Sequence, residues 1–208
     1  MKEQKILSID LDIIMHKCID LYNDDSEGGD DPDWYWEWVE NEYGYKALHL
    51  YEYDPDAILG IYKLIGLNKD KPLYFIESHE EIVDILSEQE NYKDTKYHMY
   101  NLDFHHDLWY EEETLEDFIK HKDVEYSCAN WLGYLFFEKK LASLTWLKAS
   151  NSLMPIPYAG LKMKTLGTKE FFRLENIDFD QVFFCLSPQW VPEEGQIFYK
   201  LLKTYYGK

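Results

Sequence analysis

Apolar segments typical of strands alternate with helix-like segments along most of this chain, and this alternation restricts the possible folds more than any other feature. Strands are predicted in residues 5–15, 71–81 (running into a helix up to residue 90), 95–108, 141–149, 169–174 and 181–187. Helices are predicted in residues 34–44, 53–70, 114–122, 128–140 and 192–207. The alternation predicts an α/β fold with a mostly parallel sheet. No linker divides the chain, so residues 1–208 are expected to form one small single domain.

Two local features refine this prediction. Asp54 is expected to cap the helix in residues 53–70, with Pro55 in its first turn. Residues 152–165 are expected to be irregular.

The amino-acid composition indicates which kinds of molecule the protein is expected to bind. Seven Trp, 18 Tyr and 11 Phe argue against disorder. The chain has 21 Lys and Arg against 40 Asp and Glu, a net charge of −19. Such a charge disfavours nucleic-acid backbone and anionic membranes. It favours a metal ion, an amine, a guanidinium or a basic peptide, or it serves only solubility, as in many acidic proteins.

The cysteines, the apolar runs and the N-terminal residues indicate in which cellular compartment the protein is expected. The three cysteines form no CxxC pair, which disfavours a disulfide framework or a thiolate zinc site and suits a reducing cytoplasm. No apolar run reaches roughly 18 residues, so no membrane span is expected. The first 30 residues are too acidic for a signal peptide. A cytoplasmic protein is therefore expected.

Acidic residues and histidines follow three of the predicted strands. In α/β folds, ligands bind outside the carboxyl ends of the strands. The residues that follow "KILSI", "LYFIES" and "YHMYNL" are respectively Asp10 and Asp12; His79; and Asp103, His105 and Asp107. All six are expected at one edge of the sheet. The last three either share a strand face, at two-residue spacing, or curl together as the strand becomes a loop.

Four carboxylates in one cleft repel each other unless protons or cations neutralise them. Two divalent metals would balance the four charges, and a carboxylate-rich site with few imidazoles suits Mn²⁺ better than structural zinc. Taken alone, a DxD pair after a strand is common without a metal, and His79 could be an ordinary hydrogen-bonded polar residue. Together they predict a metal site. His106 is expected to point away from His105, and Asp178 and Asp180 to lie at the opposite edge.

These motifs resemble those of a known enzyme group. "LDFHHDL" resembles the D-A-H-x-D metal motif of arginases and agmatinases, and "SIDLDII" resembles their S-x-D-x-D motif. Together with "CANWLGYLF" and "LSPQWVP", they resemble the arginase-like family that includes the peptide arginases. Those enzymes turn arginine side chains of ribosomal precursor peptides into ornithine. The resemblance spans residue 5 to about 192 and implies an arginase-like three-layer fold.

The resemblance also implies roles for the six residues. One manganese ion would bind His79, Asp103, Asp107 and Asp10. The other would bind His105, Asp103, Asp10 and Asp12, so that Asp103 and Asp10 bridge. Asp107 would be catalytic, because it would accept a hydrogen bond from the hydroxide that attacks the guanidinium carbon, with ornithine and urea as products.

The sequence departs from the family in three respects. The DxD strand precedes the DxHxD strand, the chain is short for an arginase, and Cys185 stands where a guanidinium-binding glutamate is expected. Glu77, Glu193 or Glu194 could replace that acid, or could be a solvated strand end and the first turn of a helix. Asn130 could hold a substrate amide, or Asn130 or Ser127 could cap a helix.

The predicted function is a dimanganese hydrolase that acts on arginine within a precursor peptide, where a short chain with an open cleft would fit. One alternative keeps the metals but changes the substrate to a small free guanidine or an amide. Another is a non-catalytic module that binds a metal or a peptide. Neither a nucleic acid nor a membrane is an expected partner.

Overall fold

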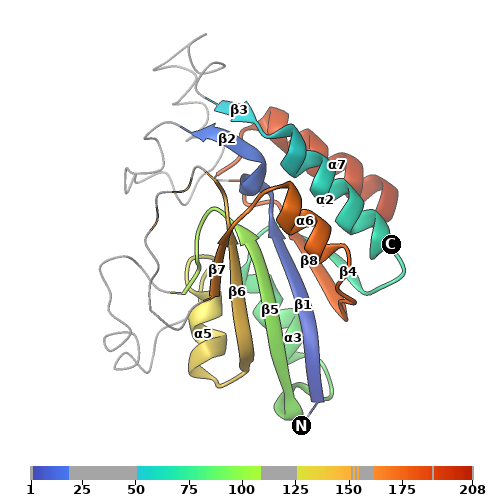
Figure 1. Ribbon diagram of the computed structural model, residues 1–208. Helices are drawn as coiled ribbons and strands as arrows, with labels where there is room; N and C mark the ends of the chain where they lie inside the picture. Colours follow the sequence, from blue (N-terminus) through green and yellow to red (C-terminus); the bar gives the residue numbers. More distant parts are fainter. Residues whose placement is uncertain are drawn as a thin grey trace.

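The computed structural model describes residues 2–18, 51–108, 126–150, 152, 154, 162–188 and 190–207 (Figure 1). Six parallel strands form one sheet in the order β4-β8-β1-β5-β6-β7. Their bounds are β1 (Lys2–Asp10), β4 (Leu73–Ile76), β5 (Thr95–Asp103), β6 (Leu141–Lys148), β7 (Lys162–Thr165) and β8 (Gln181–Cys185). The parallel sheet of an α/β fold is thereby confirmed.

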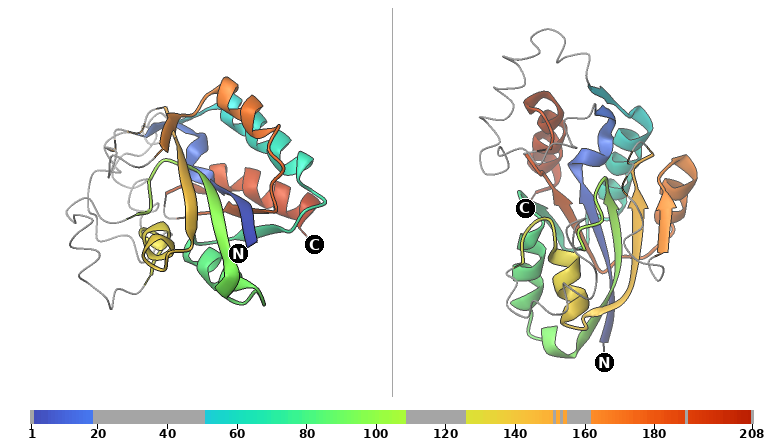
Figure 2. Two further views of the ribbon diagram at one scale, coloured as in Figure 1. Left: turned by 60° about the horizontal axis from the view of Figure 1, so that its bottom comes forward. Right: turned by 90° about the vertical axis from the view of Figure 1, so that its left-hand side faces the viewer.

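Helices cover both faces of this sheet (Figure 2). One face packs against α2 (Pro55–Leu67), α6 (Thr168–Leu174) and α7 (Glu193–Tyr206). The other face packs against α3 (Glu80–Ser87) and α5 (Trp131–Phe137). Each face has its own apolar core, so the described residues form a three-layer α/β fold in one small domain. The extent of that domain over the whole of residues 1–208 stays a prediction.

The central strand β1 shows why this sheet is buried on both sides. Leu7 and Ile9 belong to the core under α2, α6 and α7, whereas Ile6 belongs to the core under α3 and α5. A parallel strand covered on both faces is expected to read as a continuous apolar run, as "ILSI" nearly does. Ser8 is the polar exception, and it lies two residues before Asp10 on the same strand face.

Shorter elements complete the described fold. A two-stranded antiparallel sheet, β2 (Met15–Cys18) and β3 (Tyr51–Tyr53), lies beyond the carboxyl ends of the main strands, at the top of Figure 1. Two single-turn helices are η1 (Leu11–Ile14) and η4 (Tyr92–Asp94). None of the helices in the described ranges has the length and apolarity needed to cross a membrane.

The helix α2 begins as the sequence predicts. The Asp54 carboxylate accepts hydrogen bonds from the backbone N–H groups of Asp56 and Ala57, at 2.8 and 3.1 Å. Pro55 occupies the first turn, where a missing N–H group costs nothing.

Two segments have a secondary structure other than the predicted one, and the strands predicted in residues 5–15 and 95–108 end earlier, at Asp10 and Asp103. Residues 169–174 lie in helix α6, not in a strand: Phe171 and Leu174 are buried at helical spacing while Phe172 is 66% exposed. Residues 162–165 form the edge strand β7, although this region was expected to be irregular. The helices predicted in residues 34–44 and 114–122 lie outside the described residues.

The strand order decides which loops meet. The carboxyl end of β1 lies between those of β5 and β8, and β4 lies next to β8. Asp10 is opposite Cys185 on β8, and Ile9 is opposite Leu102, the residue before Asp103. The residues that follow β1, β4, β5 and β8 are therefore neighbours although they are far apart in the sequence.

Candidate metal centre

The first acidic pair lies where β1 turns into η1. Asp10 is the last residue of β1, and its Oδ1 accepts a hydrogen bond from the Asp12 backbone N–H at 2.9 Å. This cap starts the turn and places Asp12 beside the end of β5, where its Oδ1 accepts a hydrogen bond from the Phe104 N–H at 3.2 Å. Both aspartates are buried, with 2% and 0% exposure. The turn thus directs both carboxylates to the same place.

The second motif curls as a loop. The strand β5 ends at Asp103, not at residue 108 as predicted. The Asp103 Oδ1 accepts a hydrogen bond from the His105 backbone N–H at 2.7 Å, which bends the chain. Asp107 has a φ of 51°, a left-handed conformation that aspartate tolerates better than most residues. Of the two arrangements expected for this motif, the curled one is therefore correct.

Helix α5 anchors Asp107. The Trp131 Nε1–H donates a hydrogen bond to Asp107 Oδ2 at 2.7 Å. The Asp107 carbonyl accepts hydrogen bonds from the backbone N–H groups of Leu132 and Gly133, at 3.0 and 3.2 Å. These bonds join the loop to the first turn of α5 and fix the direction of the carboxylate.

His79 follows β4 and lies beside the loop that contains Asp103 and Asp107. Its ring is 2% exposed, and Nδ1 lies 3.3 Å from Asp107 Oδ2, 3.4 Å from Asp10 Oδ2 and 3.9 Å from Asp103 Oδ2. Its Nε2 lies 3.4 Å from the Ser8 hydroxyl. The ring stacks on Trp131, with 5.3 Å between centroids. A single ring nitrogen thus faces three carboxylates.

His105 faces the other side of the same group. Its Nδ1 lies 3.1 Å from Asp12 Oδ2 and 3.7 Å from Asp103 Oδ1. Its ring centroid is 4.9 Å from that of Trp190. Asp103 therefore belongs to two sets of closely spaced ligand atoms, one with Asp12 and His105 and one with His79 and Asp107.

Electrostatics favour a cation at this position. Burial, together with the neighbouring carboxylates, raises the pKa of Asp10 and of Asp103 well above the usual value. Burial also lowers the pKa of His79, so the imidazole is neutral and keeps a lone pair for a metal. Asp12 Oδ2 is buried and accepts no hydrogen bond from the described residues, although His105 Nδ1 lies 3.1 Å away. These clusters of buried aspartate and histidine can hold a metal ion.

Three polar residues that were not predicted from the sequence support the candidate ligands. The Asn101 Nδ2 donates to Asp103 Oδ2 at 3.0 Å, and the Ser187 hydroxyl donates to Asp10 Oδ2 at 2.7 Å. Ser8 contacts His79, as described above. Ser8 and Asn101 each lie two residues before a predicted ligand on the same strand, so the period of 2 could have identified both.

The predicted substrate-binding residues belong to none of the ligand clusters among the described residues. Glu77 and Glu193 are exposed, and Glu193 lies in the first turn of α7. Asn130 is buried, and its Oδ1 accepts a hydrogen bond from the Ser127 N–H at 2.8 Å, which fits a turn before α5. Their role in binding a substrate stays a prediction.

The remaining polar candidates are also placed. His106 is buried, its Nδ1 accepts a hydrogen bond from the Leu108 N–H, and its ring meets Trp146 edge-on. Asp180 accepts a hydrogen bond from the Lys5 N–H and Asp178 pairs with Lys71 at 2.6 Å. Both aspartates precede β8, so they lie at the amino ends of the strands, opposite the metal centre, as expected.

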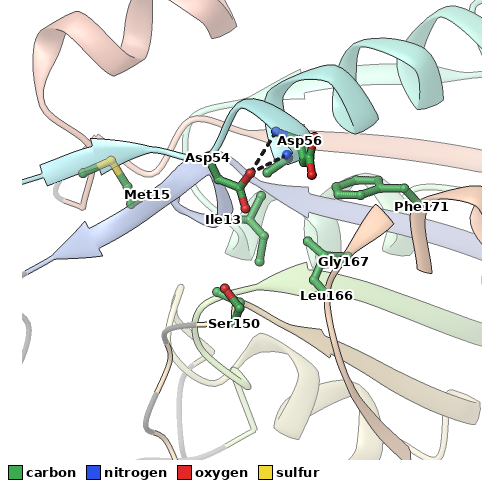
Figure 3. A pocket seen from close by; sticks show the side chains of 10 residues that line it. Ile13, Met15, Asp54, Asp56, Ser150, Leu166, Gly167 and Phe171 are labelled. Carbon is green, nitrogen blue, oxygen red and sulfur yellow. Dashed lines mark hydrogen bonds between the residues drawn. The ribbon is translucent and has the colours of Figure 1, made fainter. Parts of the chain in front are cut away.

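A cavity of about 220 Å³ lies on the α2 and α6 side of the sheet (Figure 3). Ile13, in its wall, directly follows Asp12, and the Ala149 N–H donates to the Asp103 carbonyl at 3.3 Å. The wall consists of Ile13, Met15, Asp54, Asp56, Ala57, Ala149, Ser150, Leu166, Gly167 and Phe171. Apolar side chains and polar groups both line it, polar atoms make up more of its surface than apolar ones, and Asp54 and Asp56 add carboxylates at the start of α2.

Comparison of this chain with protein-family models, with curated proteins and with solved structures found no match. The arginase-like resemblance therefore remains a prediction from the sequence motifs. The parallel sheet and the buried aspartate–histidine centre at the carboxyl ends of its strands do not depend on this resemblance.

Proposed function

We propose that this protein is a dimanganese hydrolase that converts arginine side chains of a precursor peptide into ornithine and releases urea. The observation that supports this most is the convergence of six side chains from three strand ends. Four carboxylates and two imidazoles meet there, with the Nδ1 atom of each histidine directed at the carboxylates. A purely structural role would leave these buried acids without compensating charge.

In this proposal Asp103 and Asp10 are shared between two metal positions. One position is completed by His79 and Asp107, and the other by His105 and Asp12. The donor set is rich in oxygen, which suits manganese. When bound, two such ions would lower the pKa of a water molecule and polarise the guanidinium group.

The residues of the chain have distinct tasks in the proposed reaction. Asp107, held by Trp131, accepts a hydrogen bond from the attacking water and orients it toward the guanidinium carbon. Ser187 and Asn101 hold the Asp10 and Asp103 carboxylates in fixed orientations. Such support of the ligands is a general requirement of metal sites.

Glu80 is the acid that we propose for recognition of the guanidinium group. It lies in the first turn of α3, next to His79, and the Ser78 hydroxyl donates a hydrogen bond to its Oε2. Burial lowers the pKa of the adjacent His79, and the negative charge of Glu80 acts in the opposite direction. Glu77 and Glu193, the acids expected from the sequence, are more exposed.

The cavity on the α2 and α6 side of the sheet supports a peptide substrate. A wall of apolar side chains and polar groups, with the carboxylates of Asp54 and Asp56, fits an aliphatic side chain that ends in a cation. A peptide can place one arginine at the metal centre and a second basic residue in this cavity. Free arginine has only one such side chain and cannot occupy both.

Urea release from an arginine-containing peptide, compared with free arginine and agmatine under the same conditions, tests this assignment. Faster turnover of the peptide supports it, and the Asp178→Asn variant serves as a control that alters an acid outside the centre. Faster turnover of free arginine or agmatine would assign the centre to a small guanidine. Binding of peptide without any urea release would favour the non-catalytic module.

A further inference from the structure

A buried thiol lies directly against the metal centre. Cys185 is the last residue of β8, between β1 and β4, where it is opposite Asp10 on one side and Ile76 on the other. Its side chain is 0% exposed and belongs to the core under α3 and α5. Asp10 lies at the matching position of β1, on the same face of the sheet as Ile6. The thiol and the carboxylate are therefore side by side.

The ligand atoms of Cys185, Asp10 and His79 form a compact group. One oxygen of Asp10, one ring nitrogen of His79 and the Cys185 Sγ all lie within 4.8 Å of one another. All three residues are buried. The Cys185 Sγ also lies 3.3 Å from the Ser187 hydroxyl, which itself donates to Asp10. The thiol is thus part of the same polar network as the predicted ligands.

We infer that Cys185, Asp10 and His79 form a thiolate-containing metal position that takes a soft divalent cation such as Zn²⁺ or Cd²⁺. A sulfur, a nitrogen and an oxygen ligand are a set that zinc and cadmium favour, whereas manganese prefers oxygen. Neither the sequence motifs nor the resemblance assigns a metal-binding role to Cys185.

The binding step involves no redox change. The metal–sulfur bond forms as the Cys185 S–H bond breaks, and the proton passes to the solvent. The cation then shares Asp10 and His79 with the manganese positions of the proposed function. A soft cation at Cys185 therefore competes with manganese, which makes the centre sensitive to zinc and cadmium.

This inference rests on the buried centre and not on the hydrolysis of a guanidinium group. It can therefore be tested without a substrate. Cys128 offers a matched control, because it is the other cysteine whose side chain is described, and it belongs to none of the ligand clusters among the described residues.

The experiment is a titration of the metal-free full-length chain with Cd²⁺, followed by the ultraviolet charge-transfer absorption of the cadmium–thiolate bond. The wild-type chain and Cys128→Ser are expected to give the band with saturation at one thiolate-bound Cd²⁺ per chain. Cys185→Ser is expected to lose it while still binding Mn²⁺. Persistence of the band in Cys185→Ser would overturn the inference.

A measurement on the wild-type chain alone covers the case in which Cys185→Ser does not fold. The cadmium NMR signal of a sulfur-ligated ion is displaced far from that of an ion with only oxygen and nitrogen ligands. A displaced signal is expected. A signal in the range of oxygen and nitrogen ligands only would contradict a thiolate position, whatever the chain does to peptides.

Discussion

The Trp131 indole N–H donates a hydrogen bond to Asp107 Oδ2 at 2.7 Å, across 24 residues of sequence, and both side chains are buried. The same indole stacks on the ring of His79. A single tryptophan thus holds one predicted ligand by a hydrogen bond and another by its ring face. The geometry of the centre therefore depends on helix α5 as well as on the strands.

The first prediction concerns this hydrogen bond. Trp131→Phe keeps an aromatic ring beside His79 but removes the donor to Asp107. A hydrogen bond to a charged group contributes about 1.5–3 kcal/mol, so a loss of roughly 10- to 100-fold in urea release is expected. Steady-state kinetics on an arginine peptide measure it. Tyr126→Phe, which removes a hydrogen bond to Asp84 outside the centre, is expected to retain full activity. Equal losses in the two variants would mean that the Trp131 bond has no special role.

The second prediction concerns the support of Asp10. Ser187→Ala removes the hydroxyl that donates to Asp10 Oδ2. Loss of such a supporting group typically weakens metal binding about 10- to 100-fold. Calorimetric titration with Mn²⁺ measures the affinity. Ser143→Ala is the control, because Ser143 contacts His98 on β5, away from the centre. Unchanged manganese affinity in Ser187→Ala would argue against Asp10 as a ligand.

The third prediction separates stability from metal binding. Asp10→Asn keeps both hydrogen bonds of the side chain, because the amide oxygen can accept from the Asp12 N–H and the amide nitrogen can donate to Ser187. It also removes a buried negative charge. Burial of this charge destabilises the folded state and raises the pKa of Asp10. The variant is expected to lose manganese binding and yet melt at a higher temperature in chelator at pH 7. A rise of about 2–4 °C corresponds to roughly 1 kcal/mol.

The pH dependence of this effect has a definite sign. An acid whose pKa is raised on folding stabilises the folded state fully below its unfolded pKa, and this contribution is lost as the pH rises through the folded pKa. The difference in melting temperature between Asp10→Asn and wild type is therefore expected to grow as the pH rises above about 4. Asp178→Asn provides the contrast, because Lys71 lowers the pKa of that exposed acid. A difference that does not change with pH would contradict the account.

The fourth prediction tests the packing of the fold. In α2, a Cβ atom at Gly60 would lie 2.4 Å from the Phe171 ring, so Gly60→Ala is expected to lower the free energy of unfolding by about 1–3 kcal/mol. At Gly66 in the same helix, the nearest atom would be the Tyr206 hydroxyl at 3.3 Å. Gly66→Ala is expected to be neutral or to stabilise by up to about 1 kcal/mol. Denaturation with guanidinium chloride measures both, and a larger loss in Gly66→Ala would refute this packing.

The parallel sheet and the placement of the six polar residues were predictable from the sequence. The sheet follows from the alternation of strand and helix patterns, and the placement follows from the position of each residue just after a strand. Strands that alternate with helices must run parallel, and their carboxyl ends must share one edge. The helix α6 was missed because a run such as "KEFFRL" is short and apolar enough for either structure. Its helical state depends on the contact between Phe171 and Gly60, which are far apart in the sequence.

The supporting residues were predictable only in part. Ser8 and Asn101 share a strand face with a ligand, so the pattern contained that information. Trp131 and Ser187 reach the centre through α5 and through the end of β8, and no spacing in the sequence connects them to Asp107 or Asp10. Their roles depend on the strand order, which places β8 next to β1.

The most direct test of the proposed hydrolase is to follow urea release from an arginine-containing peptide while the metal-free chain is titrated with Mn²⁺. The account predicts no urea in the presence of chelator, and activity that saturates as two manganese ions bind per chain. Urea release that persists in chelator, or its absence when two manganese ions are bound and peptide is present, would contradict the account.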